Sequence, residues 1–222
     1  WWTVAWSSAS TMPDKPRLLG NAPISGGWRL LSVEWPGAPL QPGHWLRVEQ
    51  ALLPVMNTSA GAASLLAAPD VSSVAALKPR QRYVVTGPHG TAWEMPQGDE
   101  AFVVVAGEAG IGAALFLCEH ARPRLVLLEG TSMPFRAKPT QFVLDGLPPE
   151  AIAAAPVLEA KGIPSRLANP EGQPGCFEGD VVQLYQQLPA AFHEWPVYAA
   201  LPAAALARLP SARLRATPFP AE

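Results

Sequence analysis

The most informative part of this sequence is the run Val105-Ala106-Gly107-Glu108-Ala109-Gly110-Ile111-Gly112. It ends the apolar run 101–106, which predicts a strand covered on both faces, and it leads into a predicted helix at 110–121. Glycines between a buried strand and a helix let the backbone approach a ligand, and helix N–H groups there can bind a pyrophosphate. A plain glycine turn in any parallel α/β domain would look the same, so the surrounding sequence has to decide.

The remainder of the second half alternates between apolar strand patterns and helix patterns. We expect strands at 124–129, 141–144, 165–168 and 196–200, and helices at 150–161, at 180–188 and after Pro202. Gly162 closes the helix expected at 150–161, since glycine is a preferred residue just past a helix end. Such alternation predicts a parallel sheet with helices on both faces.

The first half consists of short strand patterns separated by turn residues. The runs 28–35, 44–49 and 82–86 are rich in strand-forming residues, and Pro-Gly or Gly-Pro pairs stand between or after them. The alanine-rich segment 59–77 could hold one short helix. We therefore expect an N-terminal extension at 1–15, an antiparallel β-barrel at 16–98 and an α/β domain at 99–222.

Composition excludes several classes of protein. The 222 residues are 49% hydrophobic and 15% charged, with a net charge of -2, which argues against a nucleic-acid-binding protein. Pro, Gly or a charge interrupts each apolar run before the ~20 residues of a membrane span, so we expect no membrane span. The four histidines are scattered, which predicts no metal site. Two cysteines, Cys118 and Cys176, cannot build a disulfide framework, and we expect a reduced, cytoplasmic protein.

Four motifs stand in a fixed order along the chain. They are Pro42-Gly43-His44-Trp45, Gly87-Pro88-His89-Gly90, the glycine-rich run 107–113 and the segment 171–181, which holds Gly172, Gly175 and Gly179. Together they resemble motifs of the ferredoxin-NAD(P) reductase superfamily, and most closely those of the electron-transfer subunit of two-subunit dihydroorotate dehydrogenases. The resemblance extends from about Leu18 to Leu209. It implies a flavin-domain-like barrel followed by a nucleotide-binding-like α/β domain.

The same resemblance implies two cofactors and a partner. FAD would be held by the barrel and NAD(P)H by the sheet domain, and electrons would pass to a partner flavoprotein or redox subunit. No catalytic side chain is implied, because the protein would orient the two cofactors for hydride transfer. The residues carried over as cofactor-binding are Pro54, Val55, Asn57, Gly87, Pro88, Gly90, Gly107, Gly110, Gly112, Gly130 and Pro202.

Several positions depart from the pattern of the superfamily. The flavin motif Arg-x-[Tyr/Ile]-Ser is replaced within 52–57, and Glu108 stands where a glycine is expected. The Cys-Gly-Pro motif at the nicotinamide reads Ala200-Leu201-Pro202. Gly130-Thr131-Ser132 lacks the arginine that would bind a 2'-phosphate, which favours NAD over NADP. The four-cysteine segment of the subunit is also missing, so we expect no iron-sulfur cluster.

Three hypotheses follow from the resemblance and its departures. The first is an oxidoreductase domain with FAD/NAD(P)H-type electron transfer to a partner protein. The second is a non-catalytic scaffold or regulatory subunit that kept the fold and lost cofactor binding, and the third is a sensor that binds a nucleotide without turnover. Glu108 bears on nucleotide binding: its carboxylate would repel a phosphate if it points into the glycine turn, and the alternative is a salt bridge elsewhere that leaves nucleotide binding unaffected.

Overall fold

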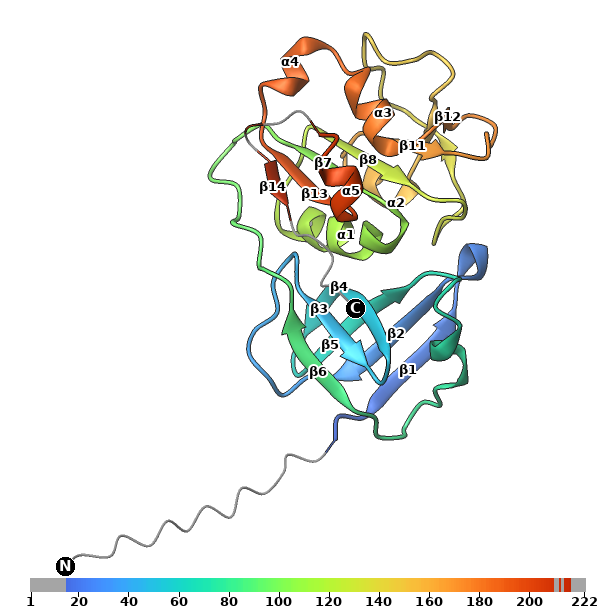
Figure 1. Ribbon diagram of the computed structural model, residues 1–222, viewed down its shortest axis with the longest axis vertical. Helices are drawn as coiled ribbons and strands as arrows, with labels where there is room; N and C mark the ends of the chain where they lie inside the picture. The colour runs from blue at the N-terminus through green and yellow to red at the C-terminus, as the bar shows by residue number, and fades with distance from the viewer. Residues whose placement is uncertain (1–14, 210–211, 213, 217–222) are drawn as a thin grey trace, which may run out of the picture.

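The computed structural model describes residues 15–209, 212 and 214–216 (Figure 1). Within that part of the chain there are two six-stranded sheets, one antiparallel and one parallel, and they follow one another in sequence. Most of the predicted N-terminal extension, residues 1–14, lies outside the described residues. The expected fold class, an antiparallel barrel followed by a parallel-sheet α/β domain, is confirmed.

The first sheet closes into a barrel. Its strands lie in the order β1-β2-β5-β4-β3-β6, with antiparallel neighbours. The Leu18 N–H donates to the Gln81 carbonyl oxygen at 2.9 Å, and the Tyr83 N–H donates to the Pro16 carbonyl oxygen at 3.0 Å. These bonds join the start of the first strand to the segment that leads into the last strand, β6. The elements are β1 (Leu18–Pro23), η1 (Ser25–Gly27), β2 (Arg29–Glu34), β3 (Trp45–Val48), β4 (Ala51–Ser59), β5 (Ala62–Ala67), η2 (Ser72–Ala76) and β6 (Val85–His89).

The alanine-rich segment 59–77 holds one short helix, as the sequence allowed, but this helix is a 3-10 helix and takes up only Ser72–Ala76. The strand β5 lies in the same segment. Ala63, Leu65 and Ala67 alternate along β5 and are buried in the barrel core, while β2 and β4 pair with its two edges. This period of two, together with pairing on both sides, overrides the helix propensity of alanine.

The second sheet is parallel and has the strand order β12-β11-β8-β7-β13-β14. Val104 and Ala106 of β7 face one hydrophobic cluster with α1, and Val103 and Val105 face another with α3, so this strand is covered on both faces. The elements are β7 (Val103–Ala106), η3 (Glu108–Gly110), α1 (Ile111–His120), β8 (Leu125–Glu129), β9 (Lys138–Pro139), β10 (Ala153–Ala154), α2 (Pro156–Glu159), β11 (Ser165–Asn169), β12 (Phe177–Glu178), α3 (Val181–Gln186), α4 (Ala190–His193), β13 (Val197–Ala200), α5 (Ala203–Leu206) and β14 (Leu214–Ala216).

Two expectations between β8 and β11 were wrong. Residues 141–144 form no strand. Of the range 150–161, where a helix is expected, only Pro156–Glu159 is helical (α2), and the short strand pair β9-β10 comes before it. Pro156 lacks an N–H and so fits the first turn of a helix but not its interior. The Glu159 carboxylate is buried and accepts hydrogen bonds from the Thr140 Oγ1 and the Gln141 N–H, which holds this excursion against the sheet.

The helix α1 joins the two domains, and it lies between the parallel sheet and the barrel in Figure 1. Phe116 on its barrel-facing side is fully buried in the core of the barrel. Across the same interface the Trp28 Nε1 donates to the Ser132 Oγ at 3.0 Å. The hydrophobic core is therefore continuous between the domains. None of the described helices is long and apolar enough to cross a membrane.

Candidate functional site

The candidate site lies where the strand order of the parallel sheet changes direction, between β7 and β13. In open α/β sheets, ligands bind at the carboxyl ends of the strands at such a point. Here the Gly107 N–H donates to the Ala200 carbonyl oxygen at 3.1 Å. A Cβ on Gly110 would lie 2.3 Å from the same oxygen, so only glycine lets this turn pack against the end of β13.

A pocket of about 370 Å³ opens at this point, which we name the switch-point pocket. Its volume is within the range of about 300–1,000 Å³ that is usual for small-molecule sites. Of the residues carried over from the resemblance, Gly107 and Pro202 line it. The other lining residues come from both domains: Ala68, Asp70, Glu108, Ala109, Glu129, Asp180, Val182, Leu201, Ala205 and Arg208.

The charge of the switch-point pocket is mostly negative. Among the described residues that line it, Asp70, Glu108, Glu129 and Asp180 carry carboxylates, and Arg208 is the cation. The Arg208 guanidinium donates to both carboxylate oxygens of Asp180, at 2.7 and 3.2 Å. The positive charge in the pocket is therefore already paired with an acid.

Asp180 also begins α3 as its N-terminal cap. Its Oδ1 accepts from the Gln183 N–H at 2.8 Å, and the Gln183 side chain accepts from the Asp180 N–H in return. Burial alone would raise the pKa of the Asp180 carboxyl, but the hydrogen bonds from Arg208 and Gln183 outweigh burial and lower the pKa. Asp180 is thus held as an anion at the rim of the pocket.

Glu108 is turned toward the loop that follows β8. Its carboxylate accepts from the Thr131 N–H at 3.2 Å, the Thr131 Oγ1 at 3.3 Å and the Ser132 Oγ at 3.4 Å. These bonds tie the turn after β7 to the loop after β8. The side chain also lines the switch-point pocket, and the three groups named above are hydroxyl and amide groups rather than the cation of a salt bridge.

Glu129 was not identified from the sequence. It ends β8, and its carboxylate accepts from the Val181 N–H at 2.7 Å. Burial raises the pKa of Glu129, and the nearby carboxylates of Asp180 and Glu108 add to the shift, whereas the Val181 bond opposes it. A charged residue at the end of the apolar run 124–129 was the available signal, because strand ends of this kind face the ligand in parallel sheets.

The residues expected to bind flavin in β4 lie away from this pocket. Val55 is in the barrel core, and the exposed Asn57 uses its Oδ1 to accept from the Thr58 N–H at 2.7 Å. Pro54 is buried where α1 meets the barrel, since a Cβ on Gly112 would lie 2.9 Å from the Pro54 Cγ. These three residues therefore offer no cation, and none of them lines the switch-point pocket.

Gly87, Pro88, Gly90 and Gly130, which the resemblance also carried over, do not line the switch-point pocket either. Gly87 and Pro88 share a cis peptide bond in β6, and a Cβ on Gly87 would lie 2.6 Å from the Leu46 Cδ2. Gly90 adopts a φ of 76°, which glycine tolerates best. Gly130 packs beside the loop after β8, where a Cβ would lie 2.6 Å from the Ser132 carbonyl oxygen.

The side chains of the switch-point pocket do not fit the diphosphate of a dinucleotide. A diphosphate needs cations or N–H donors that are free to bind it. The pocket presents carboxylates from four different segments, and Asp180 occupies its arginine. Within the described residues, no group of three or more His, Cys, Asp or Glu side chains could hold a metal ion either.

The fold is that of a known class of proteins. The structure of the ferredoxin reductase in carbazole 1,9a-dioxygenase matches with a TM-score of 0.65 at 15% identity over 93% of this chain and 69% of that one. An Amycolatopsis cytochrome P450 reductase gives 0.63 at 15% identity, over 93% and 69%. A mutant ferredoxin-NADP+ reductase from Plasmodium falciparum gives 0.62 at 10% identity, over 91% and 94%. The chain therefore has the two-domain fold of the ferredoxin reductases.

No protein-family model and no curated protein sequence matches the chain. The likeness to solved structures, at 10–15% identity, establishes the fold and leaves the activity open. The narrower resemblance to the electron-transfer subunit of dihydroorotate dehydrogenases stays a prediction.

Proposed function

We propose that this chain is a non-catalytic scaffold or regulatory subunit that kept the ferredoxin-reductase fold and lost productive cofactor binding. The observation that carries this proposal is the charge of the switch-point pocket. Carboxylates line the place where the glycine turn would receive a dinucleotide, and Arg208 is bound to Asp180. A diphosphate entering this pocket would meet repulsion and no free cation.

The cost of this repulsion is large compared with usual affinities. One carboxylate about 6 Å from a phosphate charge costs roughly 3 kcal/mol at an effective dielectric near 20, or about a hundredfold in affinity. Glu108 cannot turn away without losing its hydrogen bonds to Thr131 and Ser132. The carboxylates of Asp70 and Glu129 add to the same penalty.

The flavin side supports the same proposal. The arginine and serine of the flavin motif are replaced within β4, and each charge-assisted bond lost in this way is worth roughly 1.5–3 kcal/mol. Pro54 is buried against α1, and Asn57 bonds to its own neighbour in the chain. Within β4, no arginine stands at these positions to replace the lost charge.

A second candidate function is FAD- and NAD(P)H-dependent electron transfer to a partner flavoprotein or redox subunit. It is favoured by the shared fold and by a pocket that remains open at the switch point. When bound, the two cofactors would supply hydride transfer, and the chain would only hold and orient them. NAD is favoured over NADP, because Thr131 and Ser132 follow Gly130 where an arginine would bind the 2'-phosphate.

We place the protein in the cytoplasm for a chemical reason. Cys118 and Cys176 are both free thiols and both buried, so neither takes part in a disulfide. Free thiols persist in a reducing compartment.

The two functions are separated by cofactor retention and turnover. The purified chain is incubated with FAD, freed of excess by gel filtration, and examined for flavin absorbance and for NADH-dependent reduction of ferricyanide. We expect no stoichiometric flavin and no turnover. Stoichiometric flavin together with NADH oxidation would overturn the proposal and establish the second function.

A charge-neutralised variant tests the physical reason. Asp70→Asn combined with Glu108→Gln should bring NADH affinity up by about a hundredfold or more, as followed by calorimetry. The matched control is Glu34→Gln, which removes an exposed carboxylate from β2, outside the pocket. Equal NADH affinity of the wild type and the neutralised variant would show that charge is not what excludes the dinucleotide.

A further inference from the structure

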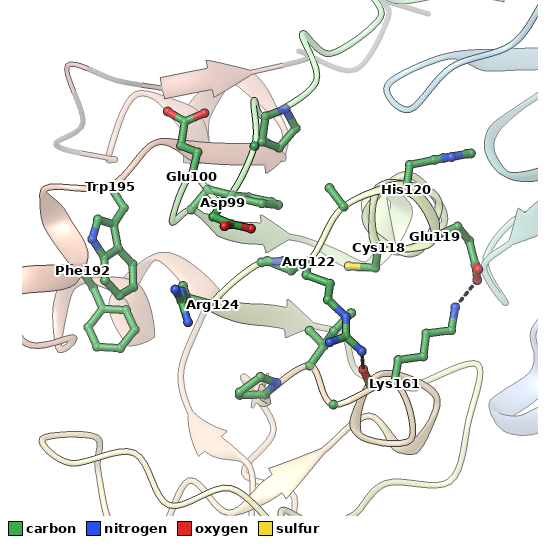
Figure 2. A pocket seen from close by; sticks show the side chains of 18 of the residues that line it. Asp99, Glu100, Cys118, Glu119, His120, Arg122, Arg124, Lys161, Phe192 and Trp195 are labelled. Atoms are coloured by element: carbon green, nitrogen blue, oxygen red, sulfur yellow. Dashed lines mark hydrogen bonds and ion pairs between the residues drawn. The ribbon is translucent and has the colours of Figure 1, made fainter.

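A larger cavity, of about 1040 Å³, lies at the amino ends of the parallel strands, opposite the carboxyl ends that form the switch-point pocket (Figure 2). We name it the edge cavity. Phe102, Arg124, Pro164 and Trp195 line it, each at or just before the start of a strand. None of the residues carried over from the resemblance lies in its wall. The edge cavity is therefore independent of the switch-point pocket and of the function proposed for it.

One wall of the edge cavity is aromatic. The rings of Phe192 and Trp195 have centroids 4.7 Å apart and an interplanar angle of 58°. Both side chains are only partly buried, and they lie side by side at the cavity in Figure 2. The Trp195 N–H donates to the Phe192 carbonyl oxygen at 3.3 Å, which fixes the spacing of the pair. Partly exposed rings held in this way are a stacking surface for a planar group.

A cation with no partner stands beside the aromatic wall. The Arg124 backbone is fixed at the start of β8, where its N–H donates to the Phe102 carbonyl oxygen at 2.9 Å. Its guanidinium makes no hydrogen bond or ion pair within the described part of the chain, and Figure 2 shows it directed toward Phe192 and Trp195. An arginine held by its backbone and free at its tip is suited to bind a phosphate.

The other cations of the edge cavity are already engaged. The Arg122 guanidinium donates to the Lys161 carbonyl oxygen at 2.7 Å. The Lys161 ammonium is paired with the Glu119 carboxylate. Arg122 retains further N–H donors, but Arg124 is the cation in the described wall whose guanidinium is wholly without a partner.

Carboxylates on the opposite wall limit the charge that a ligand can carry. Asp99 and Glu100 line the cavity, and Figure 2 shows the Asp99 carboxylate across the cavity from Arg124. The two groups do not approach within the 4.0 Å of an ion pair in the described structure. A carboxylate in this place can accept hydrogen bonds from hydroxyl or amine groups, but it repels a ligand with several negative charges.

We propose that the edge cavity binds a nucleoside monophosphate. The base stacks on the Trp195 ring beside Phe192, and the phosphate binds Arg124. Asp99 accepts a hydrogen bond from a ribose hydroxyl or an exocyclic amine of the base. One unpartnered arginine near the Asp99 carboxylate favours a single phosphate over a di- or triphosphate. Inorganic phosphate alone would use only Arg124 and leave the aromatic wall uncovered.

The test is calorimetric titration of the full chain with AMP, inorganic phosphate and ATP. We expect one AMP site per chain, with inorganic phosphate and ATP each at least about tenfold weaker. Arg124→Gln should weaken AMP binding by about 10- to 100-fold, and Asp99→Asn should weaken it by a smaller factor. The matched control is Arg136→Gln, an exposed arginine outside the edge cavity, which should leave AMP binding unchanged.

Several outcomes would overturn the proposal. These are no AMP binding at millimolar concentration, equal affinity for phosphate and AMP, or AMP affinity that Arg124→Gln does not change. AMP binding that responds to Glu108→Gln and not to Arg124→Gln would place the nucleotide in the switch-point pocket. That last result would overturn this proposal, whereas loss on Arg124→Gln alone leaves the proposed function untouched.

Discussion

Replacing Gly112 by alanine tests directly how α1 rests on the barrel. The added Cβ would lie 2.9 Å from the Pro54 Cγ and 3.2 Å from both the Pro54 Cβ and the Leu66 Cβ. Real Cβ atoms essentially never approach other heavy atoms within 3.0 Å. The proline ring and the Leu66 Cβ are both fixed to the backbone of the barrel. The helix or the strand must therefore move to admit the methyl group.

The expected magnitude comes from two opposed effects. Extra carbon in a well-packed core typically costs about 1–3 kcal/mol. Replacing a helical glycine by alanine gains up to about 1 kcal/mol through helix propensity. We expect Gly112→Ala to lower the free energy of unfolding by about 1 kcal/mol, opposite in sign to the effect at an uncrowded helical glycine.

The assay is urea unfolding of the full chain, followed by circular dichroism and tryptophan fluorescence. Pro54→Ala and the double variant complete a cycle, because removing the ring makes room for the methyl group. We expect the double variant to be about 1 kcal/mol more stable than the sum of the single effects predicts. A stabilised Gly112→Ala variant, or single effects that add within about 0.5 kcal/mol, would refute the described contact between α1 and β4.

Three further predictions concern the site, a thiol and the domain interface. Burial raises the pKa of Glu129, so the folded protein is more stable when this carboxyl is protonated, and it loses that stability as pH rises through the raised pKa. Glu129→Gln should therefore raise the free energy of unfolding near pH 7 and change it little near pH 4. Urea titration at the two pH values measures this. Burial raises the pKa of the Cys118 thiol to about 12, so iodoacetamide should label it in urea but not in the native protein, as followed by mass spectrometry; native labelling would contradict its burial. Trp28→Phe removes the bond to Ser132 and should lower the free energy of unfolding by about 1 kcal/mol, while an unchanged value would show that this bond does not hold the domains together.

The parallel sheet was the part of the fold most open to prediction from sequence. The strands at 103–106, 125–129 and 197–200 are continuous apolar runs, and such runs mark strands covered on both faces. The prediction failed between β8 and β11, where the chain is held by a buried polar network around Glu159 rather than by a periodic apolar pattern. Hydrogen bonds between residues about twenty positions apart leave no local signature in the sequence.

The candidate site was predictable in position but not in charge. The glycine turn at 107–112 marked the switch point, because close backbone approach to β13 requires glycine at Gly110. The carboxylates that line the pocket come from the loop after β5, the turn after β7, the end of β8 and the start of α3. Of the four, Glu108 stood out in the sequence because a glycine is expected there; the others look ordinary in their own segments, and Asp180 is explained by helix capping alone.

The four carboxylates of the switch-point pocket are our reason for proposing that this chain does not bind the cofactors that its fold suggests. A glycine turn at the end of a buried strand satisfies the backbone geometry of a dinucleotide site, and it does so whether or not a ligand binds, since Gly110 is needed to pack against Ala200. Charge is a separate requirement, because carboxylates repel a diphosphate unless unpaired cations offset them. Arg208 is engaged by Asp180, and Glu108 is held in place by the loop after β8. Neutralising Glu108 and Asp70 while leaving the glycines intact would therefore show which of the two requirements the chain has lost.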